Sequence, residues 1–183
     1  AAVTRVNRFF GTTWTAENCR YPVRKTQENG DDRTKPANII ITCTDNTRSR
    51  LELWRFLKKY RETSVNNERA VYYWMDFGNA QTTGQVFIGT VRNKIRQPAS
   101  KEFMPVPGIN VITEEVNYST IEEKDSGPSC SLAEALERQD LYINSILAQV
   151  GCDILWRMFK EGRTLYRGAY INLDTLRVNP IPV

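Results

Sequence analysis

The residues best suited to chemistry lie where an apolar run meets a polar one. The β-branched stretch 39–42 is followed by "TDN", residues 44–46, and then by an amphipathic segment rich in Arg and Leu. At the carboxyl end of a parallel strand, where open α/β sheets bind ligands, the Asp45 carboxylate could hold a divalent cation. An Asp or Asn before a helix can equally accept hydrogen bonds from its first backbone N–H groups. The residue types favour an N-cap, and metal binding by Asp45 stays open.

Three other polar side chains could contribute to the same edge of the sheet. Arg48 and Arg50 lie in the first part of the expected helix and could contact phosphate, although ion pairs on the helix surface are the favoured interpretation. Asp76 ends the strand-like part of "WMDFGN", residues 74–79. Asp and Gly-Asn cluster at turns, so a turn is the favoured role for Asp76.

The histidine and cysteine content restricts the chemistry further. The chain has no histidine and four cysteines, none of them in a C-x-x-C pair. Cys-His and Ser-His nucleophile pairs and His-ligated metals are therefore excluded for this sequence, and no zinc is expected. Cys43 in the apolar strand and Cys152 in an apolar helix are predicted to be buried as small hydrophobic residues. The role of Cys19 stays open.

Composition favours one globular domain. The chain has 183 residues, 40% of them hydrophobic, and a formal charge of +4 from 25 basic and 21 acidic residues. Basic residues are spread along the chain, so no nucleic-acid-binding arm is predicted. No apolar run reaches the roughly 18 residues of a membrane span, and a secretion signal is not evident, so a cytoplasmic protein is expected.

The pattern of elements predicts an α/β domain with a Rossmann-like, mostly parallel sheet, helices on both faces and a C-terminal β-hairpin. A helix is expected at the start, over residues 3–10. A buried strand (37–43), a helix (47–60) and two strands around a Gly-Asn turn (70–91) follow. Residues 92–129 form a long crossover, suited to substrate handling. A helix over 141–159 precedes the closing hairpin.

Several segments, in this order, resemble the ThiF-type, E1-like adenylating enzymes. "VTRVNRFFG" is similar to the end of the helix after the family's Lys, and "IITCTDNTRSRLEL" to its strand followed by Asp-Asn. "YYWMDFGNAQTTGQVFIG" resembles the next two strands, and "PSCSLAEALERQDLYINSILAQVGCDILWRMF" the segment with a thioester cysteine. "GAYINLDTLRV" is similar to the terminal strands. The likeness covers the C-terminal part of the family fold, and is greatest to ThiF-like proteins of plasmid-borne (PRTRC-type) clusters.

The resemblance implies ATP- and Mg²⁺-dependent adenylation of the C-terminal carboxylate of a ubiquitin-like or ThiS-like β-grasp protein. Asp45 would carry the metal, with Asn46 beside it. Gly84 and Gln85 would shape the site of the acceptor tail. Cys130, before a helix start that lowers the thiol pKa, would take the acyl group as a thioester. A cysteine without chemistry at that helix entrance remains the alternative.

The sequence also departs from the family. The glycine-rich turn that cradles phosphates, an Arg and a Lys would all precede Ala1, so an upstream segment is expected and ATP binding by this chain alone should be weak. Two hypotheses follow. The chain is part of an active enzyme, completed by a missing half or second subunit, or it is a non-catalytic module that docks a β-grasp protein or partner. Homodimers are common in the family.

Overall fold

A computed structural model describes residues 2–18, 21, 37–44, 46–61, 70–93, 95–118 and 139–183. The chain divides into two compact units, Ala1–Lys35 and Pro36–Val183. Asp45, Cys19 and Cys130 lie outside the described residues, as does the crossover beyond residue 118.

The first unit contains helix α1, Ala2–Phe10, as the sequence predicts. Gly11, at φ +65°, follows the helix in the left-handed conformation that glycine adopts readily. The side chain of Asn7 then holds the next turn of chain, because its amide nitrogen donates to the Trp14 carbonyl and its oxygen accepts from the Trp14 N–H. Phe9 and Phe10 are exposed on this helix.

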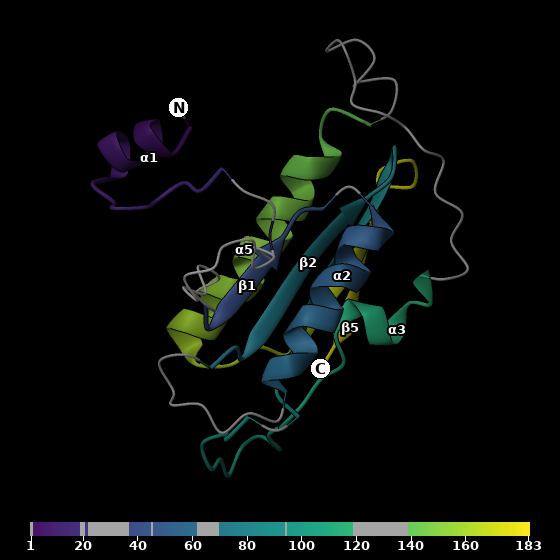
Figure 1. Ribbon diagram of the computed structural model, residues 1–183. Coiled ribbons are helices and arrows are strands. Elements are labelled where there is room, and N and C mark those ends of the chain that lie inside the picture. The colour runs from purple at the N-terminus through teal and green to yellow at the C-terminus, as the bar shows by residue number, and fades with distance from the viewer. Residues whose placement is uncertain are drawn as a thin grey trace. The chain divides into compact units, whose positions relative to one another are not determined.

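The second unit is built on one five-stranded sheet with the strand order β1-β2-β3-β4-β5. Figure 1 labels β1, β2 and β5 of this sheet. The strands are β1 (Ile39–Thr42), β2 (Tyr73–Asn79), β3 (Thr83–Thr90), β4 (Tyr166–Asn172) and β5 (Arg177–Pro182). β1 and β2 are parallel, and every later neighbouring pair is antiparallel. The α/β class is confirmed, but a mostly parallel, Rossmann-like sheet is not what this unit has.

Short connections explain two of the three antiparallel pairs, β2–β3 and β4–β5. Only residues 80–82 separate β2 from β3, and only 173–176 separate β4 from β5. Connections this short can join antiparallel neighbours only, because a parallel pair needs a crossover of a dozen residues or more. The predicted C-terminal hairpin is β4–β5. Leu176 closes its turn at φ +51°, an uncommon conformation for a residue other than glycine.

Helices cover both faces of the sheet, as predicted (Figure 1). On one face, α2 (Thr47–Leu57) and the short α3 (Ile112–Glu115) pack around Trp74 and Phe87. The 3-10 helix η1 (Lys58–Tyr60) continues α2. On the other face, α5 (Ile143–Glu161) packs against Met75 and Val86. Successive strand residues point to opposite faces, so Trp74 and Met75 belong to different cores.

Two glycines allow α5 to approach the sheet closely. A Cβ on Gly151 would overlap the ring of Phe77, and one on Gly84 would overlap the side chain of Leu147. The helix ends at Gly162, whose φ of +67° is typical of a left-handed C-cap. The strong three-and-four spacing of apolar residues therefore predicted this helix correctly, within two residues of its ends.

Candidate functional site

A buried ion pair joins the first turns of α2 to the middle of the sheet. Asp76 lies in β2 directly opposite Thr42, the last residue of β1, and only 1% of it is exposed. Arg50 reaches down from α2, and its Nε donates to Oδ2 of Asp76 at 2.8 Å. Arg50 is itself 6% exposed. The pair lies beside the carboxyl end of β1, whereas β2 continues beyond Asp76 to Asn79.

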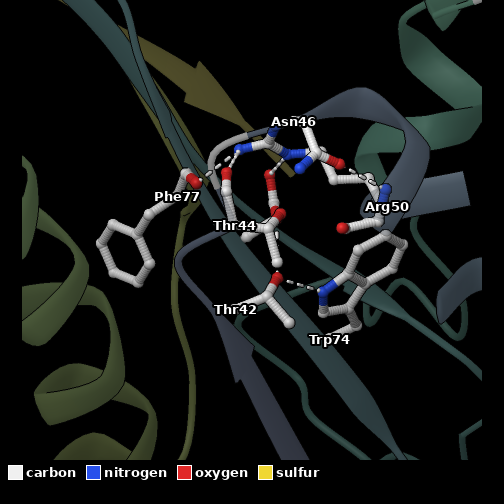
Figure 2. Close-up of polar contacts among 8 residues, drawn as sticks. Thr42, Thr44, Asn46, Arg50, Trp74 and Phe77 are labelled. Carbon is white, nitrogen blue, oxygen red and sulfur yellow. Dashed lines mark hydrogen bonds and ion pairs between the residues drawn. The ribbon is translucent and has the colours of Figure 1, made fainter. Parts of the chain in front are cut away.

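Hydrogen bonds extend from this pair into the loop before α2. Nη2 of Arg50 donates to the carbonyl of Thr44 at 2.7 Å and to that of Phe77 at 2.8 Å. The other carboxylate oxygen of Asp76 accepts from the Thr42 hydroxyl at 2.6 Å, and Trp74 Nε1 donates to that hydroxyl at 2.8 Å. Figure 2 shows the Trp74 indole directed at Thr42 and the guanidinium directed at Phe77. The network therefore fixes the β1–α2 loop from beneath.

Burial sets the electrostatics of this site. It raises the pKa of Asp76, since a carboxylate loses its hydration inside the protein, and the Arg50 charge and the hydrogen bonds from Thr42 and Arg50 offset part of the rise. Both oxygens of Asp76 have donors and the opposite charge is adjacent. The pair is thus arranged to hold structure together rather than to move a proton.

Two buried hydroxyls near the ion pair, those of Thr44 and Tyr118, have no hydrogen-bond partner among the described residues. The Tyr118 ring centre lies 6.0 Å from the guanidinium carbon of Arg50. Burial raises the pKa of Tyr118 to about 12, with Arg50 offsetting part of the rise. The Gln85 side chain is close enough to this hydroxyl to lower its pKa a little, although the two groups do not meet the geometry of a hydrogen bond.

Gly78 makes room for this arrangement. A Cβ at Gly78 would overlap the amide nitrogen of Gln85 and would come within 3.0 Å of Nη2 of Arg50. Without a side chain at this position, both groups can lie over the strand. Arg50, Asp76 and Gln85 therefore meet on one face of the sheet, whereas Gly84 lies on the opposite face beneath α5. The two neighbouring positions Gly84 and Gln85 therefore lie on opposite faces of β3.

Arg48 and Arg50 were both expected on the surface of the helix, and this prediction is confirmed for only one of them. Arg48 lies on the surface as favoured, with its side chain 82% exposed and 3.6 Å from Glu52. Arg50 does not, and the surface interpretation was wrong for it. Arg50 shares a helix face with Leu53, Trp54 and Leu57, all buried, at spacings of three, four and seven. That periodicity could have identified Arg50 as an inward-facing residue.

The expected role of Asp76 in a turn was also wrong. β2 continues three residues beyond it to Asn79, and the turn follows at 80–82. The alternation of side chains along β2 places Asp76 on the α2 face. Its carboxylate can be buried there because Arg50 neutralises the charge.

The cap of α2 is Asn46, whose side-chain oxygen accepts from the Ser49 backbone N–H at 2.8 Å (Figure 2). The sequence predicted an N-cap at this junction, and the N-cap residue is Asn46 rather than Asp45. The neighbours of Asp45 in the sequence are Thr44, held by Arg50, and this cap.

The predicted burial of two cysteines was wrong. Cys43 is exposed, since β1 is an outer strand of the described sheet, and Cys152 is exposed on α5. In α5 the buried positions are Ile143, Leu147, Gly151 and Ile154, and position 152 lies off that stripe.

A Mg²⁺ ion would find few protein ligands in the described part of the chain. No group of three His, Cys, Asp or Glu residues there could hold a metal. Asp76 is saturated by its partners. Nucleotide-bound Mg²⁺ needs only one or two carboxylates besides the phosphates and water, a role that the single residue Asp45 could fill.

Comparison with known proteins adds no assignment. No family model matches the chain, and no curated protein matches it. In the described residues, no helix is both long and apolar enough to cross a membrane. The resemblance to ThiF-type enzymes remains a prediction from the sequence.

Proposed function

We propose that this chain is the C-terminal part of an E1-like, ThiF-type adenylating enzyme that activates the C-terminal carboxylate of a ubiquitin-like or ThiS-like β-grasp protein. The observation that carries the proposal is the β1–α2 unit. It has a parallel strand, a loop fixed from below by Arg50, and a helix capped by Asn46. Because Asn46 caps the helix, Asp45 is not needed as the cap. Asp45 follows the carboxyl end of a parallel strand, where α/β sheets bind ligands.

The reaction would need little covalent work from the protein. A carboxylate oxygen of the β-grasp protein forms a bond to the α-phosphorus of ATP, and the bond from that phosphorus to pyrophosphate breaks. Catalysis then consists of positioning and charge neutralisation. Mg²⁺, held by Asp45 and the phosphates, would supply that neutralisation. The buried pair of Arg50 and Asp76 would act as a positioning element, because it holds the Thr44 carbonyl next to Asp45.

Exchange of labelled pyrophosphate into ATP tests this function. We expect exchange that requires a ThiS-type protein with a free C-terminal carboxylate, either with this chain or with this chain joined to a glycine-rich nucleotide-binding half. Asp45→Ala should reduce exchange to background. Arg157→Ala is the control, since Arg157 lies on α5 and its ion pairs are with Asp153 and Glu161 of the same helix. Full exchange by Asp45→Ala would exclude Asp45 as the metal ligand.

Transfer to Cys130 would be a separate step. The thiolate would attack the acyl carbon of the adenylate, a thioester would form, and AMP would leave. Cys130→Ala should therefore retain pyrophosphate exchange but lose the dithiothreitol-sensitive conjugate on a non-reducing gel. A conjugate that survives in Cys130→Ala would assign the acceptor to another group.

The second candidate function is a non-catalytic module that docks a β-grasp protein or a catalytic subunit. The two buried charged side chains of the described site favour it, because Arg50 and Asp76 are bonded to each other and to groups of the chain and are therefore not offered to a nucleotide. This candidate predicts binding of the β-grasp protein in calorimetry without ATP and without exchange. Exchange that depends on Asp45 would reject it.

A further inference from the structure

Two segments that are distant in the sequence meet at one edge of the sheet (Figure 1). The loop 95–107 follows the end of β3, where Thr90 pairs with Tyr73, the first residue of β2. α5 ends shortly before β4, which begins at Tyr166 and is antiparallel to β3. The loop and the end of α5 therefore both lie at the amino-terminal edge of β2. The carboxyl end of β1, which Asp45 follows, is at the opposite edge.

Arg163, which follows α5, holds the tip of this loop. Its guanidinium carbon lies 3.9 Å from the centre of the Phe103 ring, and its Nη1 lies 3.7 Å from Oε2 of Glu102. The hydroxyl oxygen of Ser100 accepts from the backbone N–H groups of Glu102 and Phe103, at 3.2 and 3.1 Å. The next side chain, Met104, is 92% exposed. The loop is thus fixed in a conformation that presents an apolar side chain to solvent.

More exposed apolar side chains lie close to this contact. Trp156 and Phe159, on the last turns of α5, are 60% and 73% exposed, and Leu165, just before β4, is 60% exposed. We call these three side chains and Met104 the amino-edge surface. β2 and β3 separate β4 from β1. A segment that extended the sheet beyond β1 would therefore lie away from Leu165 and from the loop tip held beside it.

The charges that border the amino-edge surface are mainly basic. Arg96, Lys101 and Lys160 are exposed there, and Nζ of Lys160 lies 5.5 Å from the centre of the Trp156 ring. These three cations form no ion pair with the described residues. The carboxylates of the loop and of the end of α5 each lie within 4.0 Å of an arginine. The surface therefore combines apolar side chains with cations that are available to an anionic partner.

We propose that the amino-edge surface binds an anionic lipid bilayer. Trp, Phe and Leu side chains bordered by Lys and Arg are typical of protein surfaces that enter the boundary between headgroups and acyl chains. Lys101 and Lys160 would contact the acidic headgroups. Lipid fits better than protein, because Lys is depleted in protein–protein interfaces. It also fits better than single-stranded nucleic acid, whose bases stack on rings and would leave Met104 and Leu165 uncovered.

Cosedimentation of the 183-residue chain with lipid vesicles tests this surface. Vesicles of phosphatidylcholine with about one-third phosphatidylserine should bind the protein at least about tenfold more tightly than vesicles of phosphatidylcholine alone. Salt at about 0.5 M should release the protein, because it screens exposed charges. Met104→Asp should lower binding at least about tenfold, since it places a carboxylate against an acidic, apolar boundary.

Leu176→Asp is the matched control. Leu176 is 86% exposed in the turn between β4 and β5, at the other edge of the sheet, and the substitution changes the net charge equally. This variant should bind vesicles as the unmodified chain does, and circular dichroism melting shows whether both variants are folded.

Three results would overturn the lipid-binding surface. They are no binding to either kind of vesicle, equal loss of binding in Met104→Asp and Leu176→Asp, and tighter binding to an oligonucleotide or to polyglutamate than to the acidic vesicles. Vesicle binding requires neither ATP nor a β-grasp protein. Failure of this proposal and failure of the proposed function are therefore distinguishable.

Discussion

The two faces of the sheet are held by different forces. Beneath α5 the buried contacts are apolar, with Met75, Val86, Ile88 and Ile154 packed together, and the hydrogen bond from Asn79 to Asn144 is exposed. Beneath α2 an apolar core surrounds a buried ion pair, and five hydrogen bonds join Arg50, Asp76 and Thr42 to one another and to their neighbours. Hydrophobic contacts tolerate small shifts, whereas hydrogen bonds impose direction. The α2 face is therefore the one built to hold a loop in one place.

The largest expected effect comes from breaking the ion pair on one side. Asp76→Ala should lower the free energy of unfolding by about 3–5 kcal/mol, because it leaves the Arg50 charge buried without a partner. Denaturant unfolding measures the loss. The double variant Arg50→Met with Asp76→Leu should recover most of it. A double variant as unstable as Asp76→Ala would show that other members of the network, not the lone charge, cause the loss.

The neighbouring residue probes the other face. Met75→Ala should cost about 2–4 kcal/mol, because it opens a cavity beneath α5. Adding Asp76→Ala to this variant tests whether the two faces act independently, by comparing the double loss with the sum of the single ones. We expect near-additive losses, since the two side chains point to opposite faces. A coupling above about 1 kcal/mol would contradict separate cores.

Asn46→Ala separates capping from ligand binding at the β1–α2 loop. Loss of the bond from the Ser49 N–H should cost about 1 kcal/mol of stability. Asp45→Ala should cost less than this, although it abolishes pyrophosphate exchange under the proposed function. Chemical denaturation of both variants makes the measurement. A larger stability loss in Asp45→Ala than in Asn46→Ala would return the capping role to Asp45.

Tyr118→Phe should stabilise the protein by up to about 1 kcal/mol at neutral pH, because it removes a buried hydroxyl without a partner. The pH dependence is more specific. The folded pKa is raised to about 12, so the unfolded tyrosine loses its proton first and stability falls as pH rises from about 10 to 12. The difference between the two proteins should therefore widen over that interval. A constant difference would mean that the phenol has water or another partner.

The periodicity of apolar residues predicted the helices. The lengths of the connections contained information on strand direction that the fold prediction did not use. The spacing of apolar residues in 141–159 identified α5. Arg50 is spaced from Leu53, Trp54 and Leu57 so that it lies on the buried face of α2, and this spacing could be read from the sequence. The tight turns at 80–82 and 173–176 require antiparallel neighbours, which already argued against a mostly parallel sheet. The mostly parallel sheet was inferred from the apolar run 37–43 and from strands alternating with helices, and the surface position of Arg50 was inferred without its helical spacing.

The sequence by itself determined the α/β class, the helices on both faces, the closing hairpin and the polar junction at the end of β1, because these follow from local spacing and short connections. Only the tertiary structure decided which charges meet. Arg50 and Asp76 are 26 residues apart, and their pairing depends on how α2 lies over the sheet. The place of β1 at the outside of the described sheet, and hence the exposure of Ile41 and Cys43, was likewise decided by strand order. Strand order arises from contacts between segments that are distant in the sequence, and a local sequence pattern does not report such contacts.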